Sequence, residues 1–233
     1  MLRFLVGLWA TRCVLLAAEP SAPVPPTGVS MQVALWLAAL ALLPAFVMSA
    51  TPFLRITLVL HFLRQALGTQ TAPSNQALLG LSLFLTALVM HPVAAKVQGD
   101  AWAPYQKGEI GFEQAIARAS PPLKAYLMRF AREKDIALMI ELAKAPPPRT
   151  VADLDLRIVL PAYTLSELKA GFQIGAVLFF PFLIIDIVVS SVTLATGMVQ
   201  LPPAMVSAPF KILLFVLVDG WNLVIGSLVR SVS

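Results

Sequence analysis

Three ionisable side chains lie inside a long apolar stretch near the C-terminus: Asp186, Lys211 and Asp219. Between residues 170 and 229 there is no other Asp, Glu, Lys, Arg or His. Charged groups surrounded by apolar side chains are costly unless they find a partner, and they often mark a functional site. These three residues are therefore the first to consider for chemistry.

Asp186 and Lys211 lie on opposite sides of a turn that contains Gln200. At the helical rise they are about 21 Å and about 16 Å from Gln200, a mismatch of about 5 Å that a lysine side chain can span. We expect the two residues to pair, within one chain or between neighbouring copies. We interpret the pair as structural, because it neutralises two costly charges. The alternatives are a proton or ion relay, as in a small-molecule or ion transporter, and exposure of both residues to water.

Asp186 and Asp219 also raise the hypothesis of an intramembrane aspartyl hydrolase, since paired carboxylates can activate water. However, no Gly-x-Gly-Asp element leads into Asp219, which is followed by Gly220 and Trp221. The chain also has no phosphate-binding glycine-rich loop, no Gly-x-Ser-x-Gly and no His-Glu-x-x-His motif. We therefore expect neither enzyme activity nor a cofactor.

Metal and nucleic-acid binding are not indicated either. His61 and His91 stand alone on apolar stretches, and Cys13 is the single cysteine. A metal site needs several such ligands close together. The basic residues are scattered, without the runs and interleaved aromatic residues of a nucleic-acid interface.

The composition indicates an integral membrane protein. The chain of 233 residues is 58% hydrophobic and only 12% charged, and its mean hydropathy is +0.83. Soluble domains are nearer about 45–50% apolar and about 25% charged. The surplus of apolar residues is more than a water-exposed surface can accommodate.

The N-terminus has the features of a secretory signal peptide. A positive start at Arg3 is followed by a mostly apolar run to Ala18 and then by small residues and prolines. Arg12 interrupts the apolar run, so a short uncleaved amphipathic anchor is the alternative.

The remaining chain is predicted to be all-α, a helical-hairpin membrane protein with about four long apolar helices and a short amphipathic helical middle segment. Pro44 and Pro181 fall inside apolar segments and should kink those helices. The predicted regions are a signal peptide (1–22), a Pro-rich loop (23–30), a first apolar helical pair (31–97), a charged amphipathic segment (98–162) and a C-terminal hairpin (163–233).

Arg55 follows the first apolar segment and admits two interpretations. It marks the aqueous end of a membrane span, or its helix continues into a space lined by protein, because an arginine facing lipid is costly. Further on, Ser74 or Asn75 should cap the second apolar helix. The pair His91-Pro92 predicts a kink or an end of that helix.

In the middle segment, Ser120 followed by two prolines predicts a helix start. Apolar residues recur at helical spacing up to Leu142, and the prolines from Pro146 onward should end that helix.

In the C-terminal region, Thr164 and Glu167 form a capping-box pattern that should open the long apolar helix. Gly197 should close it, Pro209 should begin the last span, and Asp219 should interrupt that span.

Five blocks of the sequence stand out together with their spacing: residues 63–76, 167–175, 180–186, 201–211 and 214–223. They resemble the FliP family, the core export-gate subunit of the flagellar type III secretion apparatus. The signal-like N-terminus and the ending Gly226-Ser227-Leu228 resemble the flagellar branch more than the virulence injectisome branch.

The resemblance implies hairpin subunits that assemble in several copies, with FliQ and FliR, into a helical cone around a central channel. The cone is expected to lie at or above the plane of the inner membrane rather than to consist of four ordinary spans. FlhA and FlhB are the further expected partners. The implied location is the bacterial inner membrane at the flagellum basal body, and the substrates are unfolded flagellar proteins, which other components drive outward. A homologous injectisome subunit is the alternative.

The resemblance also implies a gate loop at Met198, Val199 and Gln200. The family carries a run of methionines here, whose flexible thioethers suit a seal that must close and yield; this chain keeps only the first. A mixed loop can still close by apolar contact and dewetting. The alternative is an ordinary turn.

Finally, the resemblance assigns family charged positions to this chain. Asp186 and Lys211 match such positions, as do Glu167 and Arg132, and Asp219 lies in a matching block. We expect these residues to serve buried charge pairing and assembly.

Overall fold

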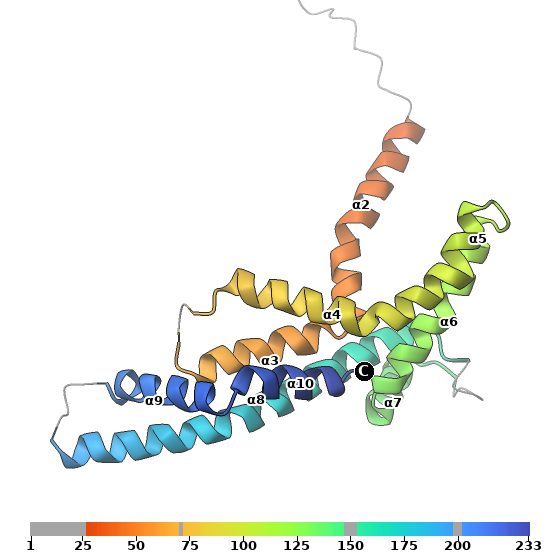
Figure 1. Cartoon of the computed structure of the whole chain (residues 1–233). Coiled ribbons are helices and arrows are strands. Elements are labelled where there is room, and N and C mark those ends of the chain that lie inside the picture. Colours follow the sequence, from red (N-terminus) through yellow and green to blue (C-terminus); the bar gives the residue numbers. More distant parts are fainter. Residues whose placement is uncertain (1–26, 70–71, 147–152, 198–201) are drawn as a thin grey trace, which may run out of the picture. The chain divides into compact units, whose positions relative to one another are not determined.

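The structure is a computed structural model, and it describes residues 27–69, 72–146, 153–197 and 202–233 (Figure 1). The predicted signal peptide lies outside the described residues. Every regular element in these residues is a helix, so the prediction of an all-α protein is confirmed for this part of the chain. The chain divides into two units, residues 1–44 and 45–233, and each is considered by itself.

In the first unit, the described residues form most of α2 (Thr27–Ser49), which carries no charged residue. Its apolar side chains, including Met31, Trp36 and Leu40, are exposed. Pro44 lies inside this helix without ending it.

The second unit is built from α3 (Phe53–Ala66), α4 (Asn75–Val97), α8 (Leu156–Ala195), α9 (Pro203–Leu217) and α10 (Gly220–Arg230). α3 is short but central, packing on α4 and above all on α8. Its buried residues Ile56, Val59, Leu60 and Leu63 recur at helical spacing and form one core with residues of the other four helices.

The close contact of α3 with α8 depends on two glycines. A Cβ atom at Gly171 would lie 2.7 Å from a methyl carbon of Leu58, and one at Gly175 would lie 2.3 Å from the ring of Phe62. Two side chains one turn apart on α3 therefore fill space that a larger residue on α8 would occupy.

A smaller group of helices links α4 to α8. A π-helical turn (Gln98–Trp102) and α5 (Ala103–Gln106) extend α4, and α6 (Phe112–Phe130) and α7 (Glu133–Leu142) follow. A second core, centred on Leu127 and Tyr163, joins α6 to the start of α8.

Several predicted helix starts are wrong, because the helices begin earlier in the chain than predicted. α8 begins at Leu156, capped by the carboxylate of Asp155, so Thr164 lies two turns inside the helix. The prolines after Ser120 lie inside α6, and Pro209 lies inside α9. Each proline removes one backbone bond, and packing on neighbouring helices offsets that loss.

The helix predicted to run to Leu142 is instead divided at Ala131 and Arg132, which separate α6 from α7. α4 continues past Pro92 to Val97, so it does not end at Pro92. At Gln98 it passes directly into the π-helical turn.

Other local predictions are confirmed. The hydroxyl of Ser74 accepts a hydrogen bond from the backbone N–H of Ala77 and caps α4. Gly197 has a positive φ of 74° directly after α8. Asp219 separates α9 from α10, and the two helices meet at an angle of 67°.

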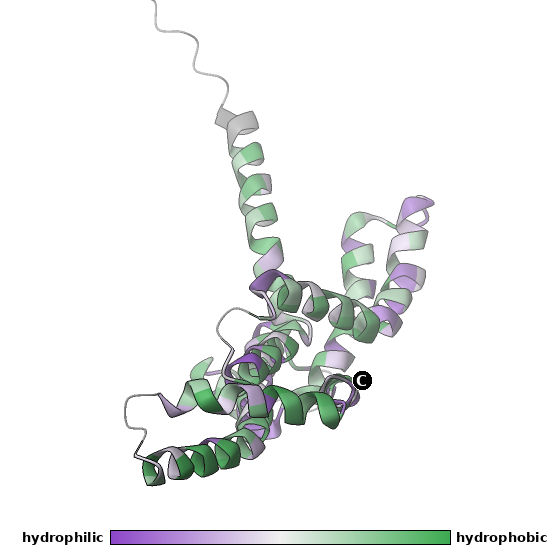
Figure 2. Cartoon of the chain, turned by 60° about the vertical axis from the view of Figure 1, so that its left-hand side comes forward, coloured by the Kyte–Doolittle hydropathy of each residue, from purple (hydrophilic) through white to green (hydrophobic). Residues whose placement is uncertain are grey.

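Two described helices are long and apolar enough to cross a membrane, namely Asn75–Gln106 and Leu156–Ala195. The number rises to as many as four if each of two bent helix pairs forms one span. Figure 2 shows the two arms of the C-terminal hairpin as mostly hydrophobic along their length. Pro181 lies inside the continuous α8.

Candidate functional site

The carboxylate of Asp186 on α8 accepts two contacts from α9. The Lys211 ammonium lies 2.6 Å from Oδ2, and the Ser207 hydroxyl donates to Oδ1 at 2.6 Å. Ser207 and Lys211 are four residues apart, so they share one face of α9. The predicted partners thus meet within a single chain, and Ser207 is a third member that the sequence interpretation missed.

The Lys211 side chain is buried, with 7% of its surface exposed, whereas the Asp186 side chain keeps 36%. The turn after α3 lies beside the ammonium, because a Cβ atom on Gly68 would be 3.9 Å from Nζ of Lys211 and 3.8 Å from Cβ of Ala208. The C-terminal end of a helix carries partial negative charge, so the end of α3 also favours the cation. The pair therefore holds three elements near one point.

Asp219 does not join this group. Its backbone is left-handed, with φ 52° and ψ 50°, and its carboxylate accepts a hydrogen bond from the Asn222 amide at 3.2 Å. Among the described contacts, Asp186 and Asp219 share no partner. In the described part of the chain, the two acids are therefore bound to different partners.

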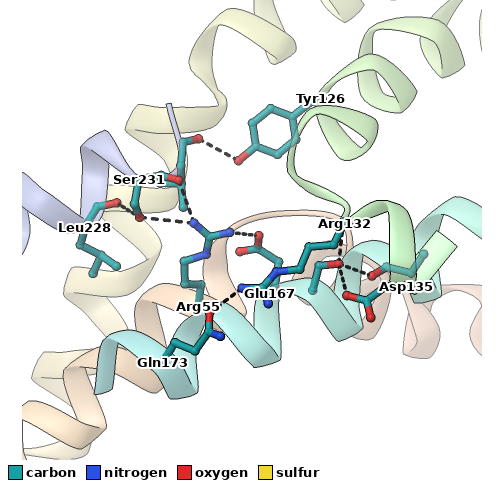
Figure 3. Close-up of polar contacts among 11 residues, drawn as sticks. Arg55, Tyr126, Arg132, Asp135, Glu167, Gln173, Leu228 and Ser231 are labelled. Atoms are coloured by element: carbon teal, nitrogen blue, oxygen red, sulfur yellow. Dashed lines mark hydrogen bonds and ion pairs between the residues drawn. The ribbon is translucent and has the colours of Figure 1, made fainter. Parts of the chain in front are cut away.

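Glu167 pairs with Arg55 of α3 (Figure 3). The sequence alone left two interpretations of the surroundings of Arg55. The exposed fractions are 6% for Arg55 and 1% for Glu167, so the interpretation of a space lined by protein is confirmed. The Arg55 guanidinium also donates to the Ser231 carbonyl at 2.8 Å and to its hydroxyl at 3.3 Å. One cation thus connects α3, α8 and the segment that follows α10.

A tyrosine from α6 adds to this connection. The Tyr126 hydroxyl donates to the Val232 carbonyl at 3.1 Å. Burial raises the pKa of Tyr126 to about 12, so the hydroxyl remains protonated and able to donate at neutral pH.

Arg132 forms hydrogen bonds with Gln173 and Ser166 rather than with Glu167. Its guanidinium donates to Oε1 of Gln173 at 2.6 Å, and its backbone N–H donates to the Ser166 hydroxyl at 2.9 Å. Arg132 is the residue before α7, so a side chain of α8 accepts from the backbone at the start of another helix.

Asp135 on α7 was not predicted from the sequence, and it is almost completely buried. The Ser166 hydroxyl donates to its Oδ2 at 2.7 Å, and the Lys169 ammonium contacts its Oδ1. Burial acts to raise the pKa of Asp135, but the hydrogen bonds from Lys169 and Ser166 outweigh it, so the pKa is lowered from 3.8. The carboxylate therefore stays ionised and ties α7 to α8.

The predicted gate loop, Met198, Val199 and Gln200, lies outside the described residues. Its flanks are described: α8 and Gly197 precede it, and α9 follows from Pro203. Within the described ranges, no group of three or more His, Cys, Asp or Glu residues could hold a metal ion.

Comparison with known proteins identifies relatives over most of the chain. The FliP family matches residues 36–228. The flagellar biosynthetic protein FliP of Pectobacterium carotovorum is 50% identical over 202 residues, which are 87% of this chain and 78% of the relative. FliP of Bacillus subtilis is 44% identical, with 87% and 91% covered. FliP of Buchnera aphidicola from Acyrthosiphon pisum is 47% identical, and this chain spans about half of it, 54%.

Proposed function

The chain belongs to the FliP family of flagellar biosynthetic proteins, and on that premise we propose that it is a channel-forming subunit of the flagellar protein export gate. The single observation that carries this proposal is the family match, which runs from residue 36 to residue 228 and so covers most of the chain, including nearly all of the C-terminal hairpin. The substrates on this proposal are unfolded flagellar proteins. Their export is required for flagellum assembly.

The surface of the hairpin supports an assembled, membrane-associated state. Exposed apolar side chains extend along both arms, among them Phe180 and Ile187 on α8 and Met205, Val216 and Leu217 on α9. Apolar patches of this extent mark contacts with lipid or with other proteins. The proposed setting is the bacterial inner membrane at the flagellum basal body, in a homo-oligomer with FliQ and FliR and close to FlhA and FlhB.

On this proposal, the loop of Met198, Val199 and Gln200 forms the constriction of the channel. The position of the loop between two apolar arms fits that role, because several copies would bring several loops together on one axis. The subunit itself performs no chemistry and holds no cofactor. Passage is then controlled by apolar contact in the loop.

The alternative of an ion relay is less well supported by the geometry. Both carboxylate oxygens of Asp186 are hydrogen-bonded, and Lys211 is buried against the end of α3. A relay residue must exchange protons with water on both sides of a membrane. The alternative of an injectisome subunit is opposed by the relatives, which carry flagellar names.

The experiment is complementation in a flagellated bacterium whose own FliP gene is deleted. Expression of this chain should restore flagellin in the culture supernatant and swimming, and the protein should co-purify with FliQ and FliR after gentle extraction. A chain with Met198, Val199 and Gln200 all changed to Gly should still co-purify but should leak or block export. Normal co-purification with no restored export by the unaltered chain would contradict the proposal.

A further inference from the structure

One acid lies on an uncovered apolar surface at the corner between α9 and α10. Asp219 is exposed, and the described contact of its carboxylate is the hydrogen bond from the Asn222 amide. An ionised carboxylate has about four acceptor positions, so most of its capacity is open. The residue also has a left-handed backbone, which is uncommon outside glycine and is found most often at functional sites. The carboxylate is thus available to a partner.

The surface around Asp219 is large and apolar. α9 packs on α8 with the face that carries Ser207, Lys211 and Phe215, and most of the rest of its surface is exposed. The large apolar side chains exposed near the corner are those of Phe210, Leu213, Val216 and Leu217 on α9 and of Leu223 on α10. Apolar surfaces of this extent mark sites of interaction.

An occupant of this surface must offer both apolar groups and a cation. Lipid offers only the first, because an ionised carboxylate in the hydrocarbon core costs roughly 2.5–3.5 kcal/mol. Water hydrates the carboxylate but leaves the apolar side chains uncovered. A protein surface that carries one basic residue in an apolar setting meets both requirements.

Arg64 on α3 is a cation without an acidic partner among the described contacts. Its guanidinium donates to Oδ1 of Asn75 at 2.5 Å and to the Pro73 carbonyl at 3.5 Å, which are both neutral groups. The exposed apolar side chains of Leu79 and Leu83 follow on α4. The start of α4 therefore presents a cation beside apolar groups.

Arg64 and Asp219 lie at similar levels along the helices. α3 runs antiparallel to α9 and α10, because its start contacts the segment after α10 and its end leads to Gly68, beside Lys211 (Figure 1). Measured from the level of Gly68 and Lys211 at the helical rise, Arg64 lies about 6 Å and Asp219 about 12 Å toward α10. An arginine side chain can span the difference. The described contacts do not join the two residues within one chain, so any pairing is between copies.

We propose that Asp219 of one copy pairs with Arg64 of the neighbouring copy, so that the α9–α10 corner packs on the start of α4 in the next subunit. The inference rests on the proposed homo-oligomeric export gate and names the surfaces that join its copies. Because the two surfaces differ, each contact leaves one surface of each kind free for a further copy. Such a head-to-tail interface closes into a ring or continues as a helix, as subunits around a channel require.

The test uses full-length chains with Cys13→Ser, co-expressed with FliQ and FliR in two differently tagged forms. One form carries Arg64→Cys and the other Asp219→Cys. After gentle extraction, a short bismaleimide should join the two forms in a product that carries both tags, and neither form alone should give a dimer. The matched control replaces Arg64→Cys by Lys96→Cys, an exposed position about 32 Å beyond Asn75 on α4, and should give no product.

Exchange of the two charges tests the pair itself. Asp219→Arg or Arg64→Asp should each lower the recovery of the homo-oligomer about tenfold, because like charges then face each other. A chain with both changes should recover most of the assembly. Each change also removes the contact with Asn222 or Asn75, but the exchanged chain lacks both contacts too, so they cannot explain the recovery.

Three results would overturn the proposal: cross-linking of Asp219→Cys to FliQ or FliR but not to the second copy, equal products with Arg64→Cys and Lys96→Cys, or an exchanged chain that assembles no better than Asp219→Arg. The export-gate proposal is tested separately, by export from the unaltered chain. If that chain restores export and these links do not form, the pairing alone is contradicted.

Discussion

The four charged side chains that are buried in the described part of the chain each contact an opposite charge. Arg55 contacts Glu167, Asp135 contacts Lys169, and Lys211 contacts Asp186. Such pairs contribute little net stability relative to an apolar replacement, but removing one member leaves the other uncompensated. We expect these pairs to favour one register of helix packing over the others.

Replacement of one member of the Arg55–Glu167 pair should therefore destabilise the fold strongly. For Arg55→Met or Glu167→Met we expect a loss of about 3–5 kcal/mol in the free energy of unfolding, measured by denaturation of the purified protein. The double replacement should cost clearly less than the sum of the two. The control is Arg157→Met, whose exposed pair with Asp155 should contribute at most about 1 kcal/mol. Additive losses would show that the two residues act independently.

Asp135 predicts a dependence of stability on pH. Its folded-state pKa is lowered below 3.8, so the group binds protons less readily in the folded state than in the unfolded state. Its contribution is fully present above the unfolded pKa of about 3.9 and is lost as the pH falls through the lowered value. Asp135→Asn should reduce the loss of stability between neutral and acid pH, measured as the change in melting temperature. An unchanged pH profile would contradict this assignment.

At single residues, the sequence identifies the charges but not all their partners. The contact between Asp186 and Lys211 was predicted correctly, because both residues lie on regular helices and their distances along the helix could be counted from Gln200. Glu167 was assigned to a helix cap and, through the family resemblance, to buried charge pairing. Its partner Arg55 was not identified, because it is 112 residues away. No spacing rule could have found the Asp135–Lys169 contact, which depends on how α7 folds back onto α8.

Among the helices, the joint between α9 and α10 is tightly constrained. A Cβ atom at Gly220 would lie 2.2 Å from ring atoms of Phe215. That ring is itself held between Phe182, with centroids 6.5 Å apart, and Trp221, at 5.4 Å. The ring cannot move aside without disturbing the core of α8, so the corner is fixed by aromatic packing.

Gly220→Ala should consequently cost about 1–3 kcal/mol through overpacking, measured by thermal unfolding. Adding Phe215→Leu should recover part of this loss. The matched control is Gly80→Ala in α4, where no atom lies within 4 Å of the added Cβ. That change should be neutral or slightly stabilising, since alanine favours a helix more than glycine does. Equal effects at both glycines would show that the corner is not tightly packed.

The sequence predicted which segments are helical, but it predicted the ends of the helices less well. Prolines such as Pro121 and Pro209 predicted helix starts, yet both lie inside longer helices. The division after α6 occurs at Ala131, where the next backbone N–H bonds to the Ser166 hydroxyl. A contact across two helices determines this boundary, so a local sequence pattern could not reveal it.

On the scale of the whole molecule, the exposed apolar surface of the second unit requires an assembly or a membrane to cover it. Membrane character followed from composition, and the all-α class followed from uncharged segments long enough to cross a bilayer as helices. The number of true spans did not follow, since two pairs of helices are bent at short breaks.

Lys211→Ala should disrupt assembly rather than gating. Without the ammonium, the partly exposed carboxylate of Asp186 lacks its counter-charge and keeps only the hydrogen bond from Ser207, and α9 loses its ionic contact beside the turn after α3. We expect the variant to be made but not to form the homo-oligomer with FliQ and FliR, measured by native gel and co-purification. Asp186→Asn with Lys211→Met should assemble better than Lys211→Ala. An intact complex with altered conductance only would contradict this prediction.

The contact of Arg55 with Ser231 joins residues 176 positions apart. A ribosome that synthesises this chain completes α3 long before the segment after α10 exists. Throughout that interval the guanidinium lacks the carbonyl that it binds in the finished fold. The helices around Arg55 can therefore reach their final packing only after synthesis has nearly ended.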